Sequence, residues 1–443
     1  MCGMTISYKD NFCDPSRIEH RGISEKHIEF GDYTLSHYKL PLQTEKGDPF
    51  DQPIALRNGN YLLFNGEIFN YPEKYKNDVE FLVDYFSVPF WENRIGSKSY
   101  NEWDGFWAIC IITPDKVYAF TDPLGKKQLY YKNGCISSEI KPLLKSDSRE
   151  PLFSFDEIQS TPLTPFKGVL RVLPNKLHIF EGTEVKVRPE ELYDLDRFPS
   201  PEWATLEEHL HESIKRRMVN RLDSNTLFVS GGLDSTIILY HLCKMGVERD
   251  FQLLTIQNSE DEKYISVLEK FFGVSIERIP GGPLGYPDLT KVISGYEHPL
   301  ERGSLFPQYH LCSKSRGSVL YSGDGADELF SGYRRALVQD TQFFDVFVEI
   351  PYYHNLRLDR VSMLFTKELR SPFLGHEVVR FALNLPYEDR IGKKILKEIY
   401  KGKIPQEIID RKKTPLRDER MFLDRKGYIE EFKRMFNKTK FIP

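Results

Sequence analysis

The apolar positions of the chain change their spacing at about residue 190. Before it they form short runs broken by turn signals, the pattern of β-strands. "GFWAICIITPDKVYAFTD" predicts two strands joined by a turn at 114–115, and "KKQLYYKNGCISSEI" predicts a pair turned at Asn133-Gly134. "NYLLFNGEIFN" predicts a strand that runs into a tight turn at Asn65-Gly66. The first half is therefore expected to consist mainly of strands.

The second half alternates helices with short buried strands. "PEELYDLDRFPSPEW" is polar and Pro-bearing and predicts a linker, after which "ATLEEHLHESIKRRMVNRL" has helical spacing. "STIILYHLCKMG" and "EDEKYISVLEKFFG" predict helices that end at Gly246 and Gly273. Between the helices, "NTLFVS", "FQLLTIQ" and "SVLYS" predict buried strands, and the chain after about 355 is expected to be mostly helical. This alternation is typical of βαβ units around a parallel sheet.

Composition narrows the classes of function. A chain of 443 residues most naturally holds two domains, and a net charge of −4 gives no electrostatic case for binding nucleic acid or an anionic membrane. No apolar run is long enough to span a membrane, and the first residues do not form a signal peptide. The six cysteines form no CxxC pair, which indicates neither a zinc site nor a disulfide framework. A cytoplasmic, reducing compartment fits this pattern best.

The chain begins "MCG", which places a cysteine at position 2. If Met1 is removed, Cys2 carries a thiol and a free α-amine on the same residue. The amine has a reference pKa of about 8, so it can act as a general base beside the nucleophile. The alternative is that the cysteine at position 2 has no chemical role.

Glycine-rich turns follow two of the predicted strands. In "NTLFVSGGLDSTIILYHL", Gly231 and Gly232 turn the chain before a helix, which offers free backbone N–H groups to an anion. In "SVLYSGDGADELFSGY", three carboxylates follow a strand within five positions. Since ligands bind at the carboxyl ends of parallel strands, both turns predict one site for a metal–triphosphate, with Asp234 and Asp327 as Mg²⁺ ligands. A structural turn and a solvated acidic turn are the alternatives.

These motifs occur together in one family. "SGGLDST" resembles the pyrophosphate loop of ATP pyrophosphatases, and "SGDGADELFSGY" is similar to a segment of glutamine-dependent asparagine synthetases. "MCG", "HRG" at 20–22 and "FNGEIFNY" resemble the glutaminase part of that family. The resemblance implies an α+β N-terminal-nucleophile glutaminase domain of sandwiched antiparallel sheets over 1–195. It further implies an α/β synthetase domain with a parallel sheet, a pyrophosphate loop and a helical C-terminal part over 196–443.

In the first half the resemblance gives roles to six residues. Cys2 would be the nucleophile, and Asn65 and Gly66 would donate to the tetrahedral oxyanion. The residues implied to bind glutamine are Lys39, Glu67 and Asp78. The family carries an arginine where Lys39 stands, and a lysine offers a point charge instead of a bidentate fork to the substrate carboxylate.

In the second half the resemblance implies ATP and Mg²⁺ as cofactors. The residues implied to bind ATP are Ser230, Gly231, Gly232, Asp234, Ser235, Ile256, Ser322 and Gly323. Asp234 and Asp327 would be the metal ligands, and Asp324 stands at a catalytic position. "GKKILKE" resembles the segment with the catalytic lysine, here Lys393, which suits an anionic adenylate and a leaving pyrophosphate. A solvated helix lysine is the alternative.

The chain departs from the family pattern at its acceptor segment. "YEHPLERGSLFPQYHL" keeps Pro307 and Tyr309, but it lacks the family's threonines and its Arg302 is out of step. In "ELRSPFLGHEVV", Gly375 replaces an acid. The closing pattern of the family is carried by Pro405, Arg411 and Lys413.

Three functions remain open at this point. The first is glutamine-dependent asparagine synthesis, in which ATP adenylates aspartate and ammonia from glutamine displaces AMP. The second is the same chemistry on another carboxylate, such as a modified sugar, a nucleobase or a natural-product precursor, and the altered acceptor segment keeps it open. The third is a degenerate regulatory homologue that binds nucleotide or glutamine, against which the survival of Cys2, Asn65 and Lys393 argues. Small molecules are the expected partners, and the oligomeric state is left open, a homodimer included.

Overall fold

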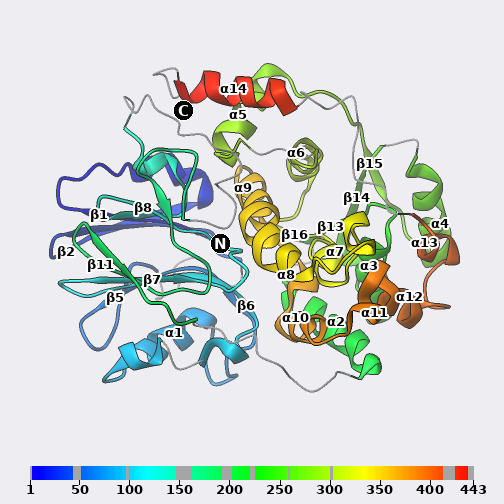
Figure 1. The fold of residues 1–443 in the computed structure, drawn as a ribbon, viewed down its shortest axis with the longest axis horizontal. Helices are drawn as coiled ribbons and strands as arrows, with labels where there is room; N and C mark the ends of the chain where they lie inside the picture. Colours follow the sequence, from blue (N-terminus) through cyan, green and yellow to red (C-terminus); the bar gives the residue numbers. More distant parts are fainter. Residues whose placement is uncertain are drawn as a thin grey trace.

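The computed structural model describes residues 2–42, 51–95, 99–145, 162–191, 202–219, 225–257, 260–299, 303–412 and 425–437. The described part of the N-terminal half holds two six-stranded antiparallel sheets that face each other (Figure 1). The first has the order β10 (Leu170–Arg171), β8 (Tyr130–Lys132), β9 (Cys135–Ser137), β1 (Cys2–Tyr8), β3 (Tyr33–Lys39), β2 (Ser24–Phe30). The second has the order β12 (Glu184–Val187), β11 (His178–Glu181), β7 (Val117–Thr121), β6 (Gly105–Ile112), β5 (Tyr61–Ile68), β4 (Ile54–Ala55).

The alternation of side chains along these strands builds the core between the sheets. Met4 and Ile6 of β1 pack there with Leu63 of β5 and Ala108 of β6. Residues on the outer face of the second sheet pack against α1 (Asp78–Phe86). The strand-rich fold expected for the first half is confirmed, and so are its turns at 114–115 and at Asn133-Gly134, where both turn residues have positive φ.

One predicted turn is wrong. β5 continues through Asn65 and Gly66, which pair with Ala108 and Trp107 of β6. Asn-Gly is a strong hairpin signal, but here the glycine serves a close approach between strands. A Cβ on Gly66 would lie 2.1 Å from the carbonyl oxygen of Phe106, so no other residue fits without a shift of the backbone.

The C-terminal half is built on a parallel sheet, as the sequence predicts. Its order is β15 (Glu277–Ile279), β14 (Phe251–Ile256), β13 (Asn225–Phe228), β16 (Val319–Tyr321), β17 (Glu368–Arg370). The chain leaves β13 toward β14 and β15, and later returns to the other side of β13 with β16. The crevice at a parallel sheet's switch point therefore lies between the ends of β13 and β16. β17 lies in the part expected to be mostly helical, and the periodicity of the sequence gave no sign of this strand.

Helices cover both faces of the parallel sheet. One face packs against α2 (Trp203–Arg217), α3 (Leu233–Met245), α4 (Glu262–Phe272), α10 (His376–Leu383), α12 (Lys394–Tyr400) and α13 (Gln406–Ile409). The other face packs against α5 (Tyr286–Tyr296), α6 (Leu305–Lys314), α9 (Asn355–Met363) and α14 (Arg425–Asn437). The other α-helices of the described residues are α7 (Ala326–Leu329), α8 (Gln342–Phe344) and α11 (Tyr387–Arg390), and a π-helix over Asp345–His354 leads into α9. α3 and α4 end at Gly246 and Gly273 in the left-handed conformation, as predicted.

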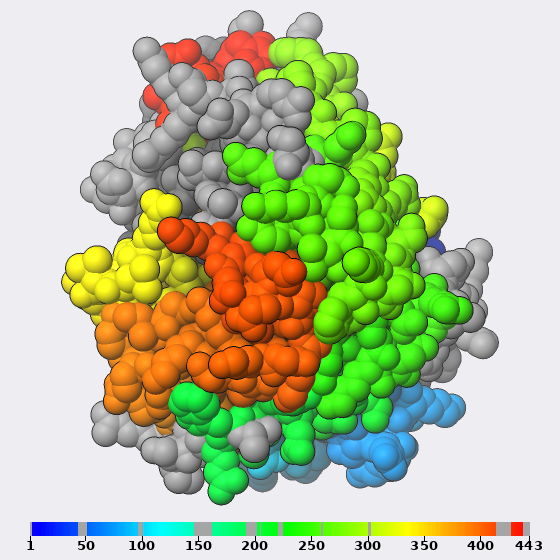
Figure 2. All heavy atoms as spheres, turned by 90° about the vertical axis from the view of Figure 1, so that its right-hand side faces the viewer, coloured from blue at the N-terminus to red at the C-terminus, as the bar shows by residue number. Residues whose placement is uncertain are grey.

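The outer surface of the C-terminal half shows how its late segments close the fold. In Figure 2 the orange segment that holds α12 and α13 lies against the green segment that holds α3 and α4. The predicted linker falls mostly on 192–201, outside the described residues. Within the described residues, no helix is long and apolar enough to cross a membrane.

Candidate active sites

The predicted nucleophile lies at an edge of the space between the two antiparallel sheets. Cys2 is the first residue of β1 and is buried, on the same face as Met4 and Ile6. Asn65 follows Leu63 by two residues on β5, so it points from the facing sheet into the same space. The alternation of two strands from different sheets thus brings Asn65 against Cys2.

Asn65 contacts Cys2 through its side-chain oxygen. The main-chain nitrogen of Cys2 donates to Oδ1 of Asn65 at 3.0 Å, and removal of Met1 would turn this nitrogen into the free α-amine. Nδ2 of Asn65 is buried and has no hydrogen-bond partner within the described part of the chain. A buried amide donor without a partner is a group that an oxyanion would satisfy. The geometry agrees with the role that the resemblance implies for Asn65.

The thiol of Cys2 is activated by its surroundings. Burial alone would raise the pKa of this thiol, but His37 and other nearby groups outweigh burial and lower the pKa to about 6. His37 lies on β3, opposite Met4, and its Nε2 is buried without a hydrogen-bond partner in the described structure. The thiolate is therefore accessible near neutral pH, which a nucleophilic cysteine requires. Nothing in the sequence points to His37, because a lone histidine in a strand carries no motif.

Two carboxyl groups predicted to bind glutamine lie near the nucleophile. Glu67 is on the inner face of β5, and Asp78 is the first residue of α1, where its Oδ2 accepts from Ile68 N at 3.0 Å. Burial raises the pKa of Glu67 to about 8 and that of Asp78 to about 6. The charge of Cys2 also contributes to the pKa of Asp78, and the charge of Asp78 to the pKa of Glu67. These acids are poised to ionise when a cation arrives.

Lys39 lies directly opposite Cys2 in the pairing of β1 with β3. Its ammonium forms an ion pair with Oδ1 of Asp51 at 2.5 Å, and the lysine side chain is mostly buried while that of Asp51 is half exposed. A substrate carboxylate at this place would compete with Asp51 for a single ammonium group.

The second candidate site is a cavity of about 590 Å³ at the switch point of the parallel sheet. Its walls include the turns that follow β13 and β16, as both glycine-rich motifs predict. Of the implied ATP, metal and catalytic residues, the cavity is lined by Ser230, Gly232, Asp234, Ser235, Ser322, Gly323, Asp324, Asp327 and Lys393. Gly231 is in the same turn with a φ of +66°, and Ile256 is the buried last residue of β14, but neither lines the cavity.

Lys393 joins the two predicted metal ligands. Its ammonium lies 2.7 Å from both carboxylate oxygens of Asp234 and 2.6 Å from Oδ1 of Asp327. Burial alone would lower the pKa of Lys393, but the two carboxylates raise it above its ordinary value. The residue has a φ of +61° just before α12, a conformation that is rare for lysine and common at functional sites. The alternative of a solvated helix lysine is therefore wrong.

The comparisons with known proteins match one family model to each half of the chain. The asparagine synthase family model matches residues 205–349 and 337–438, and the glutamine amidotransferase domain model matches residues 12–191. This chain belongs to the glutamine-dependent asparagine synthetase family. It is therefore an enzyme of the ligase class that joins a glutamine amidotransferase domain to an ATP-using synthetase domain.

Its relatives are distant. A probable asparagine synthetase of Acanthamoeba polyphaga mimivirus is 25% identical over 88% of this chain and 78% of that protein. A putative asparagine synthetase of Methanocaldococcus jannaschii is 27% identical over 71% of each chain. The asparagine synthetase of Gallus gallus is 26% identical over 94% of this chain and 84% of its own.

One departure from the family pattern, Gly375, has a structural explanation. Gly375 precedes α10 where that helix packs on α2, and a Cβ there would lie 2.2 Å from Oγ of Ser213. The N–H of His376 is instead satisfied by Asp104 of the amidotransferase half, whose Oδ1 accepts at 3.1 Å. Asp104, from the amidotransferase half, thus caps the N-terminus of α10 in place of a side chain at position 375.

In the acceptor segment, Pro307 and Tyr309 are buried in α6 and do not line the cavity. Ser304 and Gln308 of the same segment do line it, although the sequence gave no reason to choose them. Arg302 and Lys413 lie outside the described residues. Arg411 lines the cavity and donates to the carbonyl oxygen of Ser230 at 3.1 Å.

Arg357 is a further cavity residue that sequence reasoning missed. It lies on α9, and its Nη2 donates to Oδ1 of Asp324 at 2.8 Å. The guanidinium, acting against burial, lowers the pKa of Asp324. The segment "NLRLDRVSM" places three charged residues in a helix that is buried along its length, and this pattern could have signalled functional charges.

Proposed function

We propose that this ligase makes asparagine from aspartate, with glutamine as nitrogen donor and ATP as activator of the acceptor. The observation that carries the proposal is the contact between Cys2 and Asn65. In the second half of the same chain, the carboxylates of Asp234 and Asp327 both pair with Lys393. The proposal keeps the division of the chain into 1–195 for glutamine hydrolysis and 196–443 for synthesis.

In the amidotransferase half, Sγ of Cys2 attacks the amide carbon of glutamine, and the α-amine freed by loss of Met1 takes the thiol proton. Nδ2 of Asn65 donates to the oxyanion, with Gly66 beside it. The amine returns the proton to the leaving nitrogen, so ammonia departs and a thioester remains, which water hydrolyses to glutamate. Glu67 and Asp78 bind the substrate ammonium, and Lys39 binds its carboxylate.

In the synthetase half, an oxygen of the acceptor carboxylate attacks the α-phosphorus of ATP and pyrophosphate leaves. Ammonia, kept within the protein and away from water, then attacks the activated carbonyl carbon, and AMP leaves. The turn at Ser230–Ser235 and the turn at Ser322–Gly323 hold the phosphates through backbone N–H groups. Lys393 stabilises the charge on the leaving pyrophosphate.

Asp234 and Asp327 fit a magnesium ion. Their carboxylate oxygens converge on the ammonium of Lys393, and hard carboxylate oxygens are the ligands that Mg²⁺ takes beside substrate phosphates. When bound, Mg²⁺ neutralises charge on the phosphates. We therefore assign these two residues as its protein ligands and Lys393 as the cation that balances them in its absence.

Gln308 supports an acceptor that carries an ammonium group. It lines the cavity, and its Oε1 is buried with no hydrogen-bond partner in the described structure. Its Nε2 is already committed to backbone carbonyl groups, with a distance of 3.2 Å to Leu358 O. An oxygen acceptor held in this way suits the α-ammonium of aspartate.

The second candidate is the same chemistry on another carboxylate. The cavity wall formed by Ser304 and Gln308 belongs to the segment that departs from the family pattern, which is the observation that favours it. An acceptor with hydroxyl groups in place of the ammonium would also satisfy these two side chains.

The test is a single incubation with ATP, MgCl₂, aspartate and glutamine labelled with ¹⁵N at the amide. Asparagine that carries ¹⁵N, with one pyrophosphate for each asparagine, supports the first candidate. Glutamate without asparagine or pyrophosphate contradicts aspartate as acceptor and moves the search to other carboxylates. A protein that hydrolyses no glutamine under any of these conditions contradicts both candidates.

A Cys2→Ala variant tests the division of labour. We expect it to lose glutamine-supported synthesis by more than about a thousandfold, because the nucleophile is gone. Synthesis from added ammonia should persist within about threefold, since the second site is untouched. Loss of both activities together would contradict the proposed roles of the two halves.

A further inference from the structure

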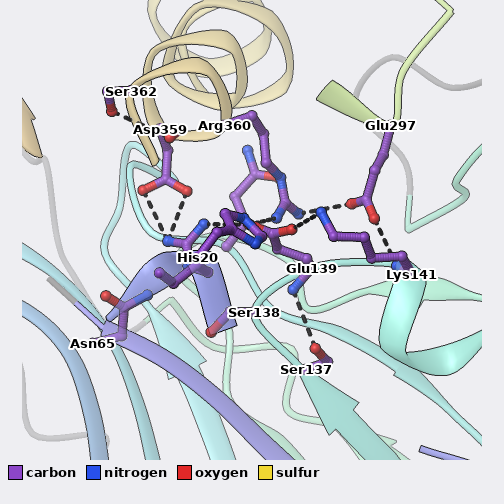
Figure 3. Close-up of polar contacts among 12 residues, drawn as sticks. His20, Asn65, Ser137, Ser138, Glu139, Lys141, Glu297, Asp359, Arg360 and Ser362 are labelled. Atoms are coloured by element: carbon purple, nitrogen blue, oxygen red, sulfur yellow. Dashed lines mark hydrogen bonds and ion pairs between the residues drawn. The ribbon is translucent and has the colours of Figure 1, made fainter. Parts of the chain in front are cut away.

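Buried charged side chains join the two halves of the molecule (Figure 3). Those from the amidotransferase half are Arg21, Lys127, Glu139 and Lys141, and those from the synthetase half are Glu297, Asp359 and Arg360. Burying charge is costly unless each group is paired, so this layer must be held in one arrangement. Each half pairs some of these charges itself, but Asp359 is paired with Arg21 and Lys127 across the junction, which makes the junction specific.

Arg21 connects this layer to the proposed nucleophile. It is fully buried, and its Nε donates to the carbonyl oxygen of Cys2 at 3.1 Å. Two glycines allow this contact. A Cβ on Gly22 would lie 2.5 Å from the carbonyl carbon of Tyr38, and Gly3 already lies so close to Arg21 that a Cβ there would be 3.1 Å from its Cβ. The arginine and glycine of "HRG" and the glycine of "MCG" therefore serve one contact.

The other end of Arg21 is held by the synthetase half. Its Nη2 lies 3.0 Å from Oδ2 and 3.3 Å from Oδ1 of Asp359 on α9, while its Nη1 donates to Glu139 at 2.8 Å. Lys127, also from the amidotransferase half, donates to Oδ1 of Asp359 at 2.8 Å. Both ion-pair partners of Asp359 thus come from across the junction, and its carboxylate fixes the guanidinium that contacts Cys2.

The opposite face of the same helix reaches the synthetase cavity. Arg357 precedes Asp359 by two residues, which turns its side chain by about 200° around the helix axis. It donates to Asp324 at 2.8 Å, as described above. In Figure 1, α9 runs between the antiparallel sheets and α6. One short helix therefore holds the guanidinium of Arg21 beside Cys2 and the carboxylate of Asp324 in the synthetase cavity.

We propose that Asp359 is a positioning residue for glutamine hydrolysis: through Arg21 it fixes the main chain of Cys2, so the synthetase half completes the glutaminase site. This inference rests on the proposed role of Cys2. In the proposed role Cys2 becomes the N-terminal residue once Met1 is removed, and chain ends fray unless they are tied down. A displacement of Sγ by about 1 Å costs a nucleophile on the order of a hundredfold in rate.

The decisive variant is Asp359→Asn in the full chain, compared with Glu297→Gln. Both variants replace a buried carboxylate of the junction by its amide. Glu297 contacts Arg360 and accepts from the N–H groups of Ile140 and Lys141. Within the described residues it makes no hydrogen bond or ion pair with Arg21. We expect Asp359→Asn to lower kcat for glutamine hydrolysis by about tenfold to a hundredfold, with KM for glutamine changed by less than about threefold. Pyrophosphate release supported by added ammonia should stay within about threefold in both variants. Asp359→Glu, which keeps the charge, should recover most of the lost glutamine hydrolysis.

Three outcomes would overturn the proposal. In the first, Asp359→Asn hydrolyses glutamine as fast as the unmodified enzyme. In the second, its glutamine hydrolysis and its ammonia-supported synthesis fall by the same factor. In the third, Glu297→Gln shows the same selective loss of glutamine hydrolysis. In the last two cases Asp359 would only hold the halves together. If Asp359→Asn does not fold, Arg21→Lys decides, because one ammonium cannot take the place of a guanidinium that bonds three separate residues. A selective loss of glutamine hydrolysis supports the proposal, and full retention overturns it.

The same experiment separates this inference from the function on which it rests. If Cys2→Ala still hydrolyses glutamine, the proposed nucleophile is wrong. If hydrolysis requires Cys2 and Asp359→Asn leaves it intact, the nucleophile stands and only the positioning role fails.

Discussion

The two proposed sites treat their carboxyl groups in opposite ways. Beside Cys2, burial raises the pKa of Glu67 to about 8 and that of Asp78 to about 6. In the synthetase cavity, Arg357 lowers the pKa of Asp324, and Lys393 lies within 2.7 Å of Asp234 and Asp327. Both sets of acids are removed from bulk water. Arg370 lies 3.5 Å from Oε1 of Glu67 and does not offset the effect of burial. The cations of the second set lie within 2.8 Å of their carboxylates.

The difference indicates what each ligand brings. Acids whose pKa values stay raised by burial are not fully balanced by positive charge, and the ammonium of glutamine would add that charge and favour their ionised forms. Asp234 and Asp327 are already paired with Lys393, so they need no cation from the acceptor. A metal ion that arrives with ATP would replace Lys393 as their positive partner. The proposed glutamine site is thus short of the positive charge that the ammonium of its substrate carries.

The largest expected effect comes from removing the cation of the synthetase site. Lys393→Ala leaves Asp234 and Asp327 facing each other without their shared ammonium, and it removes the group assigned to the leaving pyrophosphate. We expect pyrophosphate release to fall about a hundredfold or more, with glutamine and with added ammonia alike. Pyrophosphate and glutamate assays on one preparation measure this directly.

The next residue provides the control for that variant. Lys394 forms an ion pair with Asp389 and is about half exposed, so Lys394→Ala should leave both assays within about twofold. If Lys393→Ala lowered glutamine hydrolysis as strongly as pyrophosphate release, the cation would serve the whole fold, and the contrast between the sites would lose its basis.

A smaller effect is expected from Asn65→Asp in the amidotransferase half. The aspartate keeps an oxygen for the nitrogen of Cys2 but loses the Nδ2 donor, so glutamine hydrolysis should fall about a hundredfold. Ammonia-supported synthesis should be unchanged. Asn58→Asp, before the opposite end of β5, is the matched control: Asn58 donates to Phe86 O at the end of α1 and accepts from Asn60 N, and neither contact involves Cys2. Equal losses in the two variants would mean that the donor of Asn65 is not used.

The pH dependence of glutamine binding tests the raised acids themselves. Glu67 and Asp78 must be ionised to hold an ammonium, and their pKa values of about 8 and about 6 place that ionisation near neutral pH. The affinity of Cys2→Ala for glutamine should therefore rise with pH across this window, by about tenfold overall. Calorimetric titration at pH values on both sides of the window measures it. Glu67→Gln should remove the upper part of the rise, whereas a flat profile in Cys2→Ala would show that neither acid binds the ammonium.

The sequence predicts the synthetase site better than the glutaminase site, for a physical reason. Glycine-broken strand ends of a parallel sheet meet at one crevice, so Asp234 and Asp327 could be placed together from local patterns alone. Asn65 and Cys2 come from different sheets, and no local pattern records their contact. The hairpin signal of Asn65-Gly66 even indicated the wrong structure there. Only the resemblance to a family placed these residues in one site.

The ion pairs that join the two halves were the feature least predictable from the sequence. Arg21 and Asp359 are separated by 338 positions, and each is an ordinary charged residue until the fold buries both. β17 was missed for a related reason: a strand of three residues is too short to show a period, and pairing with β16 determines its structure. Charge patterns inside buried helices, such as that of α9, are the signal that could have exposed the junction.

The smallest expected effect concerns Lys39, where the chain departs from the family arginine. Its single ammonium is already paired with Asp51, so a substrate carboxylate must share it. In Lys39→Arg the guanidinium can bond both groups at once, and KM for glutamine should fall about two- to fivefold with kcat unchanged. Asp51→Asn should have a similar effect by the opposite route, because it releases the lysine. If both variants raise KM instead, the ion pair itself shapes the pocket, and the glutamine carboxylate is held by other groups. In that case the complementarity inferred for Glu67 and Asp78, in which the site is short of the charge that its ligand brings, would not extend to Lys39.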